Sequence, residues 1–175
     1  MNKRAFISFI CLFAILISSC AQVKKVYAYK QASIPGNIIG SDDNDIKENN
    51  EAKQSVRKQN FNYWFYLSIP KKEKVVVNGL WIDNQQYDIK SDTITNLPVI
   101  KIVFTGLEKN DTTIMVPATT NRVILIYPGP ARTNDSKKGS TLAKTNELVI
   151  RYIYKGKTYY TTIGKIRELT PDVRV

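Results

Sequence analysis

The sequence predicts an all-β fold, and three observations support that prediction. Between residues 61 and 166 the chain divides into eight or nine short segments rich in β-branched and aromatic residues,. Pro, Gly, Asn or Asp separates each segment from the next, and no long segment repeats its apolar residues with the period of a helix,. The pattern is typical of a sandwich or barrel, and we expect one antiparallel, immunoglobulin-like β-sandwich over residues 61–175.

The expected strands begin at Phe61. Along residues 61–69, alternation places the odd-numbered side chains, Phe61, Tyr63, Phe65, Leu67 and Ile69, on one face, as in a strand that covers a core,. A turn at residues 70–73 follows. The remaining strands are expected over residues 74–78, 79–82, 86–89, 99–105, 112–116, 122–127, 148–154 and 158–166.

Two of the connections between strands have the composition of tight hairpins. Asp83-Asn84-Gln85 separates two apolar segments, and Asn and Asp tolerate the backbone conformations of turns,. Tyr154-Lys155-Gly156-Lys157 is the stronger signal, because Gly supplies the positive φ that a two-residue hairpin turn requires,. Both hairpins favour antiparallel pairing of the flanking strands.

The composition excludes several kinds of chemistry. A length of 175 residues allows one ordinary domain,. Because the chain contains no histidine, it cannot use Ser-His, Cys-His or zinc-His mechanisms,. We therefore expect a protein that is not an enzyme and that needs no cofactor or metal.

The N-terminal segment has the organisation of a secretory signal peptide. Lys3 and Arg4 give a charged start, and residues 5–17 form an apolar run interrupted only by Ser8,. This run is shorter than the about 20 apolar residues that a transmembrane helix needs. Small residues then lead to Cys20.

The end of this segment, Ile17-Ser18-Ser19-Cys20, resembles the lipobox of bacterial lipoproteins. The resemblance covers residues 1–20 and implies that residues 1–19 are removed and that Cys20 receives two or three fatty chains, enough for stable membrane binding. Cleavage after Ala21 and an uncut anchor are the alternatives. Cys11 would leave with the signal, so the mature domain would have no thiol and no disulfide,.

The same resemblance bears on location. Ala21-Gln22 lacks the Asp that, in this family, keeps a lipoprotein in the inner membrane, and no acidic run follows Cys20. The resemblance therefore implies a cell-envelope protein that is anchored in the outer membrane and faces the periplasm.

Residues 20–60 are expected to join the anchor to the domain. Residues 26–30 have the composition of a short edge strand,. Residues 40–60 contain only three apolar residues, Ile46, Ala52 and Val56, and cannot bury enough surface to offset the entropy of ordering,. We expect a flexible polar tether there.

The formal net charge is +11 and favours anionic partners,. Basic residues cluster at Lys24-Lys25, at Lys71-Lys72 with Lys74, and at Arg132 with Lys137-Lys138. The candidate contacts for an anionic lipid or glycan are Lys71, Lys72, Arg132, Lys137 and Lys138. In an envelope compartment nucleic acid is not an expected partner. The alternative is a basic surface that is simply solvated.

Two further features are candidate contact surfaces. Trp64 and Tyr66 point away from the face that Phe65 shares, so they form a candidate aromatic surface, with a core role as the alternative,. Residues 127–140 are expected to be the longest loop of the β region. They contain no phosphate-loop motif and no helix is expected after them, so a mobile connection is the ordinary interpretation,.

Three patterns resemble catalytic or metal sites without meeting the requirements of one. Ser55-Val56-Arg57-Lys58 has the S-x-x-K spacing of serine β-lactamases without its partner motifs,. Asp42-Asp43-Asn44-Asp45 with Glu48 is rich in oxygen ligands without the spacing of a calcium loop,. The aspartates in predicted turns or at strand ends are ordinary turn formers: Asp83, Asp88, Asp92, Asp111 and Asp135,.

Two functions remain. The first is a non-enzymatic, lipid-anchored envelope protein that acts as a binding or accessory module for a membrane protein complex. The second is a periplasmic binder of a small ligand, lipid or glycan with a cavity in its β domain.

Overall fold

The computed structural model describes residues 23–33, 60–103 and 110–172. The expected signal peptide, Cys20 and most of the expected tether lie outside these residues. Within them the chain forms strands and one short helix: β1 (Lys25–Ser33), β2 (Asn60–Ile69), β3 (Val75–Ile82), β4 (Gln85–Ile94), β5 (Val99–Val103), β6 (Asp111–Val116), β7 (Arg122–Arg132), α2 (Lys137–Ala143), β8 (Leu148–Tyr154), β9 (Lys157–Ile163) and β10 (Arg167–Asp172).

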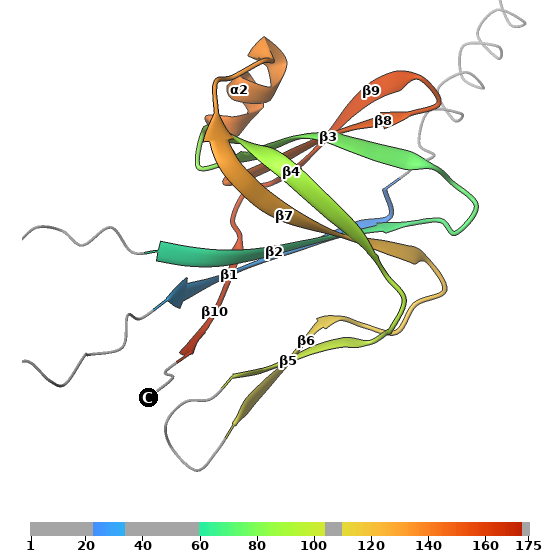
Figure 1. The fold of residues 1–175 in the computed structure, drawn as a ribbon, viewed down its shortest axis with the longest axis vertical. Coiled ribbons are helices and arrows are strands. Elements are labelled where there is room, and N and C mark those ends of the chain that lie inside the picture. Colours follow the sequence, from blue (N-terminus) through green and yellow to red (C-terminus); the bar gives the residue numbers. More distant parts are fainter. Residues whose placement is uncertain (1–22, 34–59, 104–109, 173–175) are drawn as a thin grey trace, which may run out of the picture.

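Eight of the strands form one curled sheet in the order β10-β1-β2-β7-β4-β3-β8-β9, and β5 pairs with β6 in a separate hairpin (Figure 1). Neighbouring strands are antiparallel, except that β1 and β10 are parallel. The all-β prediction is confirmed. A sandwich of two packed sheets and an immunoglobulin-like topology are not confirmed, because a single sheet supplies eight of the strands.

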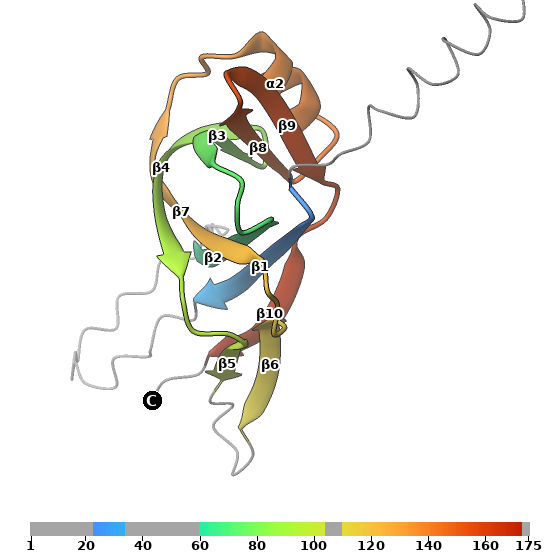
Figure 2. The same ribbon diagram turned by 90° about the vertical axis from the view of Figure 1, so that its right-hand side faces the viewer.

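The curl follows from the short connection between the two outermost strands. β9 ends at Ile163 and β10 begins at Arg167, yet these strands are the opposite edges of the sheet. Four peptide steps span about 15 Å at most. The sheet must therefore bend around until these parts of its edges approach each other, as Figure 2 shows.

The inside of the curled sheet is filled with apolar side chains. Fully or almost fully buried residues from β1, β2, β3, β7 and β8 pack there: Ala28, Phe65, Leu67, Ile69, Val75, Leu80, Ile82, Ile124, Ile126, Leu148, Ile150, Tyr152 and Tyr154, joined by Ile166. Tyr63 packs against them from its half-buried position. The predicted inward face of β2 is thus confirmed for Tyr63, Phe65, Leu67 and Ile69, whereas Phe61 lies outside this cluster. Burial of the cluster is the main stabilising contribution in a domain without a described disulfide.

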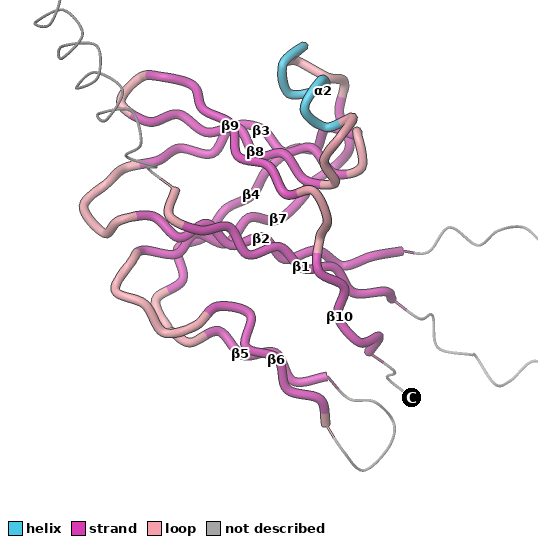
Figure 3. Tube along the Cα trace, turned by 180° about the vertical axis from the view of Figure 1, so that it is seen from behind, coloured by secondary structure: helices cyan, strands magenta, loops and turns pink. Residues whose placement is uncertain are grey.

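The β5–β6 hairpin and helix α2 pack on the outer face of the sheet. The β5–β6 hairpin contributes Met115 and Val116 to a second apolar cluster, which contains Tyr66 of β2 and Leu125 of β7. Helix α2 lies at one end of the sheet, as the backbone trace of Figure 3 shows. It covers Trp81 and forms a third, smaller cluster. Strands β2, β3, β7 and β8 therefore bury residues of both faces, which explains the continuous buried runs at residues 65–69, 79–82, 123–126 and 148–150,.

Both expected hairpins are present. Asp83 and Asn84 have φ values of 48° and 67°, and Lys155 and Gly156 have values of 48° and 73°. Positive φ at both central residues is the signature of the type I′ turn, whose twist matches that of paired strands. The turn chemistry of the sequence therefore predicted these connections correctly.

The first strand differs from the prediction for residues 26–30. β1 extends over Lys25–Ser33 and lies between β2 and β10, so it is an interior strand and not an edge strand. The sheet consequently begins before residue 61, and residues 34–59 connect β1 to β2 rather than an anchor to the domain.

The expected loop over residues 127–140 is wrong in two ways. β7 continues through Pro128-Gly129-Pro130 to Arg132, where an irregular register opposite Asp88 accommodates residues that cannot donate to the ladder,. Helix α2 then begins at Lys137, after the N-cap Ser136, whose hydroxyl accepts the Gly139 N–H. The ordered connection is therefore limited to residues 133–136.

Candidate functional site

The basic residues singled out from the sequence lie at two ends of the sheet. Lys71 and Lys72 occupy the turn before β3, whereas Arg132 ends β7 and Lys137 and Lys138 open α2. Strand β3 joins the two ends, and its 8 residues correspond to about 26 Å at the usual rise per residue,. The structure therefore does not bring these cations together in one patch.

At the α2 end, Arg132 lies in a network of ion pairs. Its Nη1 is 3.2 Å from Oδ1 of Asp88, and its Nη2 is 3.7 Å from Oδ2 of Asp135. Asp135 also accepts two hydrogen bonds from Arg151, at 2.9 and 3.0 Å, one to each carboxylate oxygen. Arg151 completes the network through Asn78, whose backbone and side-chain oxygens both accept from it. The carboxylates thus already neutralise much of the charge of Arg132.

This network fixes the connection between β7 and α2. The hydrogen bonds from Arg151 hold the pKa of Asp135 below its ordinary value, against a smaller opposing effect of desolvation. The backbone N–H of Asp135 also donates to Oε1 of Gln86 at 2.8 Å. Bidentate Arg–carboxylate contacts of this kind orient both partners, so the role supported here is structural.

Lys137 and Lys138 are exposed on the first turn of α2. The ammonium of Lys138 lies 5.2 Å from the centre of the Tyr160 ring, a cation–π contact,. Tyr160 in turn forms a 2.9 Å hydrogen bond with Ser136, the residue that caps the helix. These two lysines therefore remain open to solvent next to a network that is otherwise occupied with structural contacts.

The candidate aromatic surface is wrong for Tyr66 and is largely covered at Trp64. Tyr66 is 2% exposed and packs in the cluster beneath the β5–β6 hairpin, with its hydroxyl 3.8 Å from the sulfur of Met115. Burial raises the pKa of Tyr66 to about 12. Trp64 packs against the same cluster, and the ammonium of Lys101 lies 3.9 Å from its ring. The core interpretation of these residues is supported, because the hairpin covers this side of β2.

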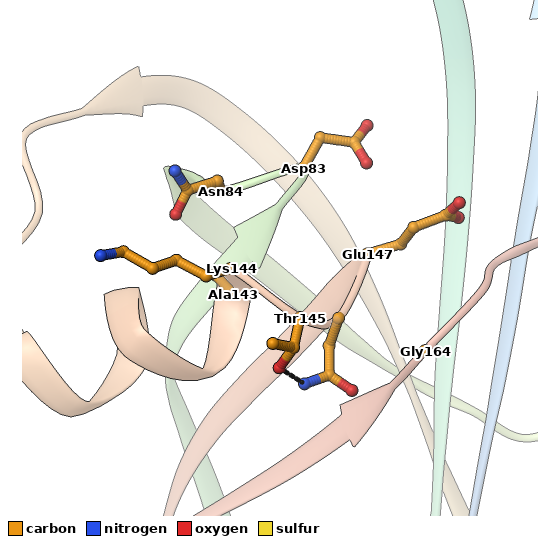
Figure 4. Close-up of a pocket in the computed structure, with 8 residues that line it drawn as sticks. Asp83, Asn84, Ala143, Lys144, Thr145, Glu147 and Gly164 are labelled. Atoms are coloured by element: carbon orange, nitrogen blue, oxygen red, sulfur yellow. Dashed lines mark hydrogen bonds between the residues drawn. The ribbon is translucent and has the colours of Figure 1, made fainter.

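A depression that the sequence did not indicate lies between the β3–β4 turn and the end of α2 (Figure 4). Its volume is about 330 Å³, and it is open and lined by polar groups, among them Asp83, Lys144 and Glu147. Glu147 is already engaged: its Oε2 accepts the backbone N–H of Ile166 at 2.7 Å and lies 3.5 Å from the ammonium of Lys30. A second open depression, of about 280 Å³, adjoins Arg132.

The aspartates at the predicted turns and strand ends have ordinary partners or positions. Asp83 forms the β3–β4 turn, and Asp88 and Asp135 share Arg132. Asp111 accepts a 2.9 Å hydrogen bond from the hydroxyl of Thr170. The ranges 42–48 and 55–58, which contain the other two patterns, lie outside the described residues.

The described ranges contain neither a candidate metal centre nor a candidate membrane-spanning helix. Within residues 23–33, 60–103 and 110–172, no three acidic or thiol side chains gather closely enough to hold a metal ion. No helix in the same described part is long and apolar enough to cross a bilayer. In comparisons with known proteins, no family model, curated protein or solved structure matches this chain.

Proposed function

We propose that this chain is a non-enzymatic lipoprotein of the bacterial cell envelope, anchored through Cys20 in the outer membrane and facing the periplasm. Its β domain acts there as a binding or accessory module. The lipobox resemblance of residues 17–20 is the basis of the anchor, and one structural observation makes the proposal more specific.

That observation is the start of β1 at Lys25. Cys20 precedes it by five positions, so the connecting chain can span about 18 Å at most,. A lipid on Cys20 would therefore hold the sheet close to the bilayer. The flexible tether expected from the sequence does not separate Cys20 from the domain, because the polar residues 40–59 follow β1 instead of preceding it.

An apolar face on the β5–β6 hairpin supports the second part of the proposal. Ile100, Ile102 and Ile114 are 51%, 55% and 57% exposed, and Ile100 pairs directly with Ile114 across the two strands. The other side of the hairpin is buried against the sheet. Clustered apolar side chains in water often mark a protein-binding site, so we assign this face to an envelope protein partner with an apolar surface.

The alternative of a small-ligand binder has less support. A binding cavity would be expected inside the curled sheet, where instead the large side chains of Phe65, Leu67 and Leu80 are fully buried and in mutual contact with the rest of the core. The two depressions described above are open and polar, whereas ligand cavities are mostly apolar and enclosed,.

Replacing Cys20 by Ala tests the anchor. The native protein should sediment with outer membranes and carry a diacylglycerol mass on the peptide that begins at residue 20, whereas Cys20→Ala should lose both the modification and stable partitioning into the membrane. Cys11→Ala is the matched control, because it changes the other thiol without touching the lipobox. Unchanged partitioning of Cys20→Ala, or an unmodified N-terminal peptide in the native protein, would refute the proposal.

A further inference from the structure

Three lysine-containing segments lie at the same end of the sheet: the start of β1, the β2–β3 turn and the β8–β9 turn. Lys25 pairs with Ser68, and the backbone N–H of Lys24 donates to the Ser68 carbonyl at 2.8 Å, so the start of β1 lies beside the β2–β3 turn. Val75, which follows that turn, pairs with Tyr154 and brings the β8–β9 turn to the same end. Figure 2 faces this end of the molecule.

The charge of this end is almost entirely of one sign. Residues 23–25, 70–74 and 154–157 contain seven lysines and a single acidic residue, Glu73. All seven lysines are exposed: Lys24, Lys25, Lys71, Lys72, Lys74, Lys155 and Lys157. Two of their ammonium groups lie over tyrosine rings, that of Lys25 at 4.9 Å and that of Lys155 at 5.0 Å from the ring centre.

The opposite end has a different character. Some of its cations pair with carboxylates, as in Arg132 with Asp88 and Asp135, and Lys30 with Glu147. Lys137, Lys138 and Lys144 of the same end are exposed. Ser33 and Asn60, where residues 34–59 leave and re-enter the sheet, are paired with each other at this opposite end. The sheet is therefore polarised along its strands, with a lysine-rich end and an end of mixed charge.

We propose that the lysine-rich end is a membrane-docking surface that binds the anionic headgroups of the bilayer in which the protein is anchored. The inference rests on the proposed function, because a lipid on Cys20 would hold this end within about 18 Å of the bilayer. About 18 Å is the greatest separation that the connecting chain allows, so the lysines can approach within the Debye length of about 8–10 Å, where a negatively charged surface attracts them. Anchor and lysines together set the orientation: α2 points away from the membrane.

Charge reversal at the two ends separates docking from a general effect of net charge. Lys71→Glu/Lys72→Glu/Lys74→Glu changes the lysine-rich end, and its matched control, Lys137→Glu/Lys138→Glu/Lys144→Glu, changes the α2 end by the same charge. All six side chains are exposed, so both variants are expected to fold,.

The native protein and both variants are purified as full mature chains and reconstituted into nanodiscs of phosphatidylcholine alone or of equal parts phosphatidylcholine and phosphatidylglycerol. Acetylation of lysines is then followed by mass spectrometry. In anionic discs, Lys72 and Lys157 should be modified about fivefold more slowly than in neutral discs, whereas Lys137 and Lys144 should react equally in both. High salt should abolish the difference.

The variants give the second readout. Lys157 should lose its protection in the β2–β3 turn variant and keep it in the α2 variant. Equal reactivity of Lys157 in the two kinds of disc, or equal protection at both ends, would overturn the docking surface even when the anchor is present. Lys24 and Lys25 are left out of the comparison, because an anchor alone would shield them.

The mass of the N-terminal peptide, measured in the same mass spectra, shows separately whether Cys20 carries a lipid. If Cys20 carries no lipid, the mature chain is mixed with vesicles of the two compositions and sedimented. Binding to the anionic vesicles that falls at least about tenfold in the turn variant, but not in the α2 variant, would still support the docking surface. Equal sedimentation of the two variants would overturn it.

Discussion

Replacing Gly139 by Ala tests the packing of α2 on the sheet. A Cβ at this position would lie 2.4, 2.6 and 2.8 Å from the Cζ2, Cη2 and Cε2 atoms of Trp81. Trp81 is fully buried, and its indole N–H donates to Oδ1 of Asn134 at 2.8 Å. The ring therefore cannot move aside without losing that hydrogen bond or displacing the neighbours that bury it.

Two opposing effects determine the sign of the change in stability. Ala in a helix is favoured over Gly by about 0.5–1 kcal/mol. Overpacking a buried site costs about 1–3 kcal/mol, and three atoms closer than any normal contact place Gly139 in the upper part of that range,. We expect a net loss of about 1–2 kcal/mol, which corresponds to a decrease in Tm of about 3–6 °C.

Thermal unfolding followed by circular dichroism measures this loss. Gly164→Ala is the control, because no atom lies within 4 Å of a Cβ built there, and its effect should stay within about 0.5 kcal/mol,. Trp81→Phe removes the six-membered part of the indole, so Gly139→Ala should cost less in that background than in the native protein. An increase in Tm for Gly139→Ala would show that helix propensity prevails and that the packing argument is wrong.

Two further predictions concern the charge network and the apolar face. Because the native pKa of Asp135 is lowered, its carboxylate stabilises the fold above the unfolded pKa of about 4 and loses this effect as the pH falls through the native pKa,. The free energies of unfolding in urea of the native protein and of Asp135→Asn should therefore differ at neutral pH and converge in acid. A difference that does not depend on pH would contradict this. Replacing the three exposed isoleucines of the hairpin by threonine (Ile100, Ile102, Ile114) should leave Tm nearly unchanged but abolish cross-linking to an envelope protein that the native chain captures,. The control Val76→Thr, at a residue of β3 that is 61% exposed, should retain this cross-linking. Equal cross-linking by both variants would contradict the binding role assigned to the hairpin.

The sequence predicted elements in which a single requirement, such as burial against the core or a positive φ in a turn, determines the residue type. Phe65, Leu67 and Ile69 alternate because only the inner face of β2 meets the central cluster. Gly156 marks its hairpin because the turn requires positive φ at that position,. In both cases a local pattern and the tertiary environment agree, so the sequence alone was sufficient.

Helix α2 was missed because it leaves almost no periodic signal. Its buried residues are Gly139 and Ala143, two small side chains that allow the helix to approach Trp81 closely. An apolar stripe of large residues, the usual sign of an amphipathic helix, is therefore absent from Lys137–Ala143,. The N-cap Ser136 was the available signal, and one Ser among polar residues is weak evidence on its own.

Strand β10 and the covered outer face depend on contacts between distant segments. Arg167–Asp172 buries Leu169 and pairs with β1 as an edge strand, so its own sequence shows no alternation. Tyr66 resembled a surface residue because the sequence does not reveal that the β5–β6 hairpin folds over β2. The separation of the basic clusters likewise depends on the fold, since β3 lies between Lys71 and Lys137.

The interior position of β1 also changes what an anchor would do mechanically. An edge strand is held by one neighbour and can be peeled away, whereas β1 pairs with β2 along its whole length and with β10 on its other side. Force applied through Cys20 would therefore act on two ladders of hydrogen bonds and on the central core that Ala28 joins. Together with the short connection to Cys20, this firm attachment favours a domain held in one orientation at the membrane surface, so a partner would meet its apolar hairpin at a defined height.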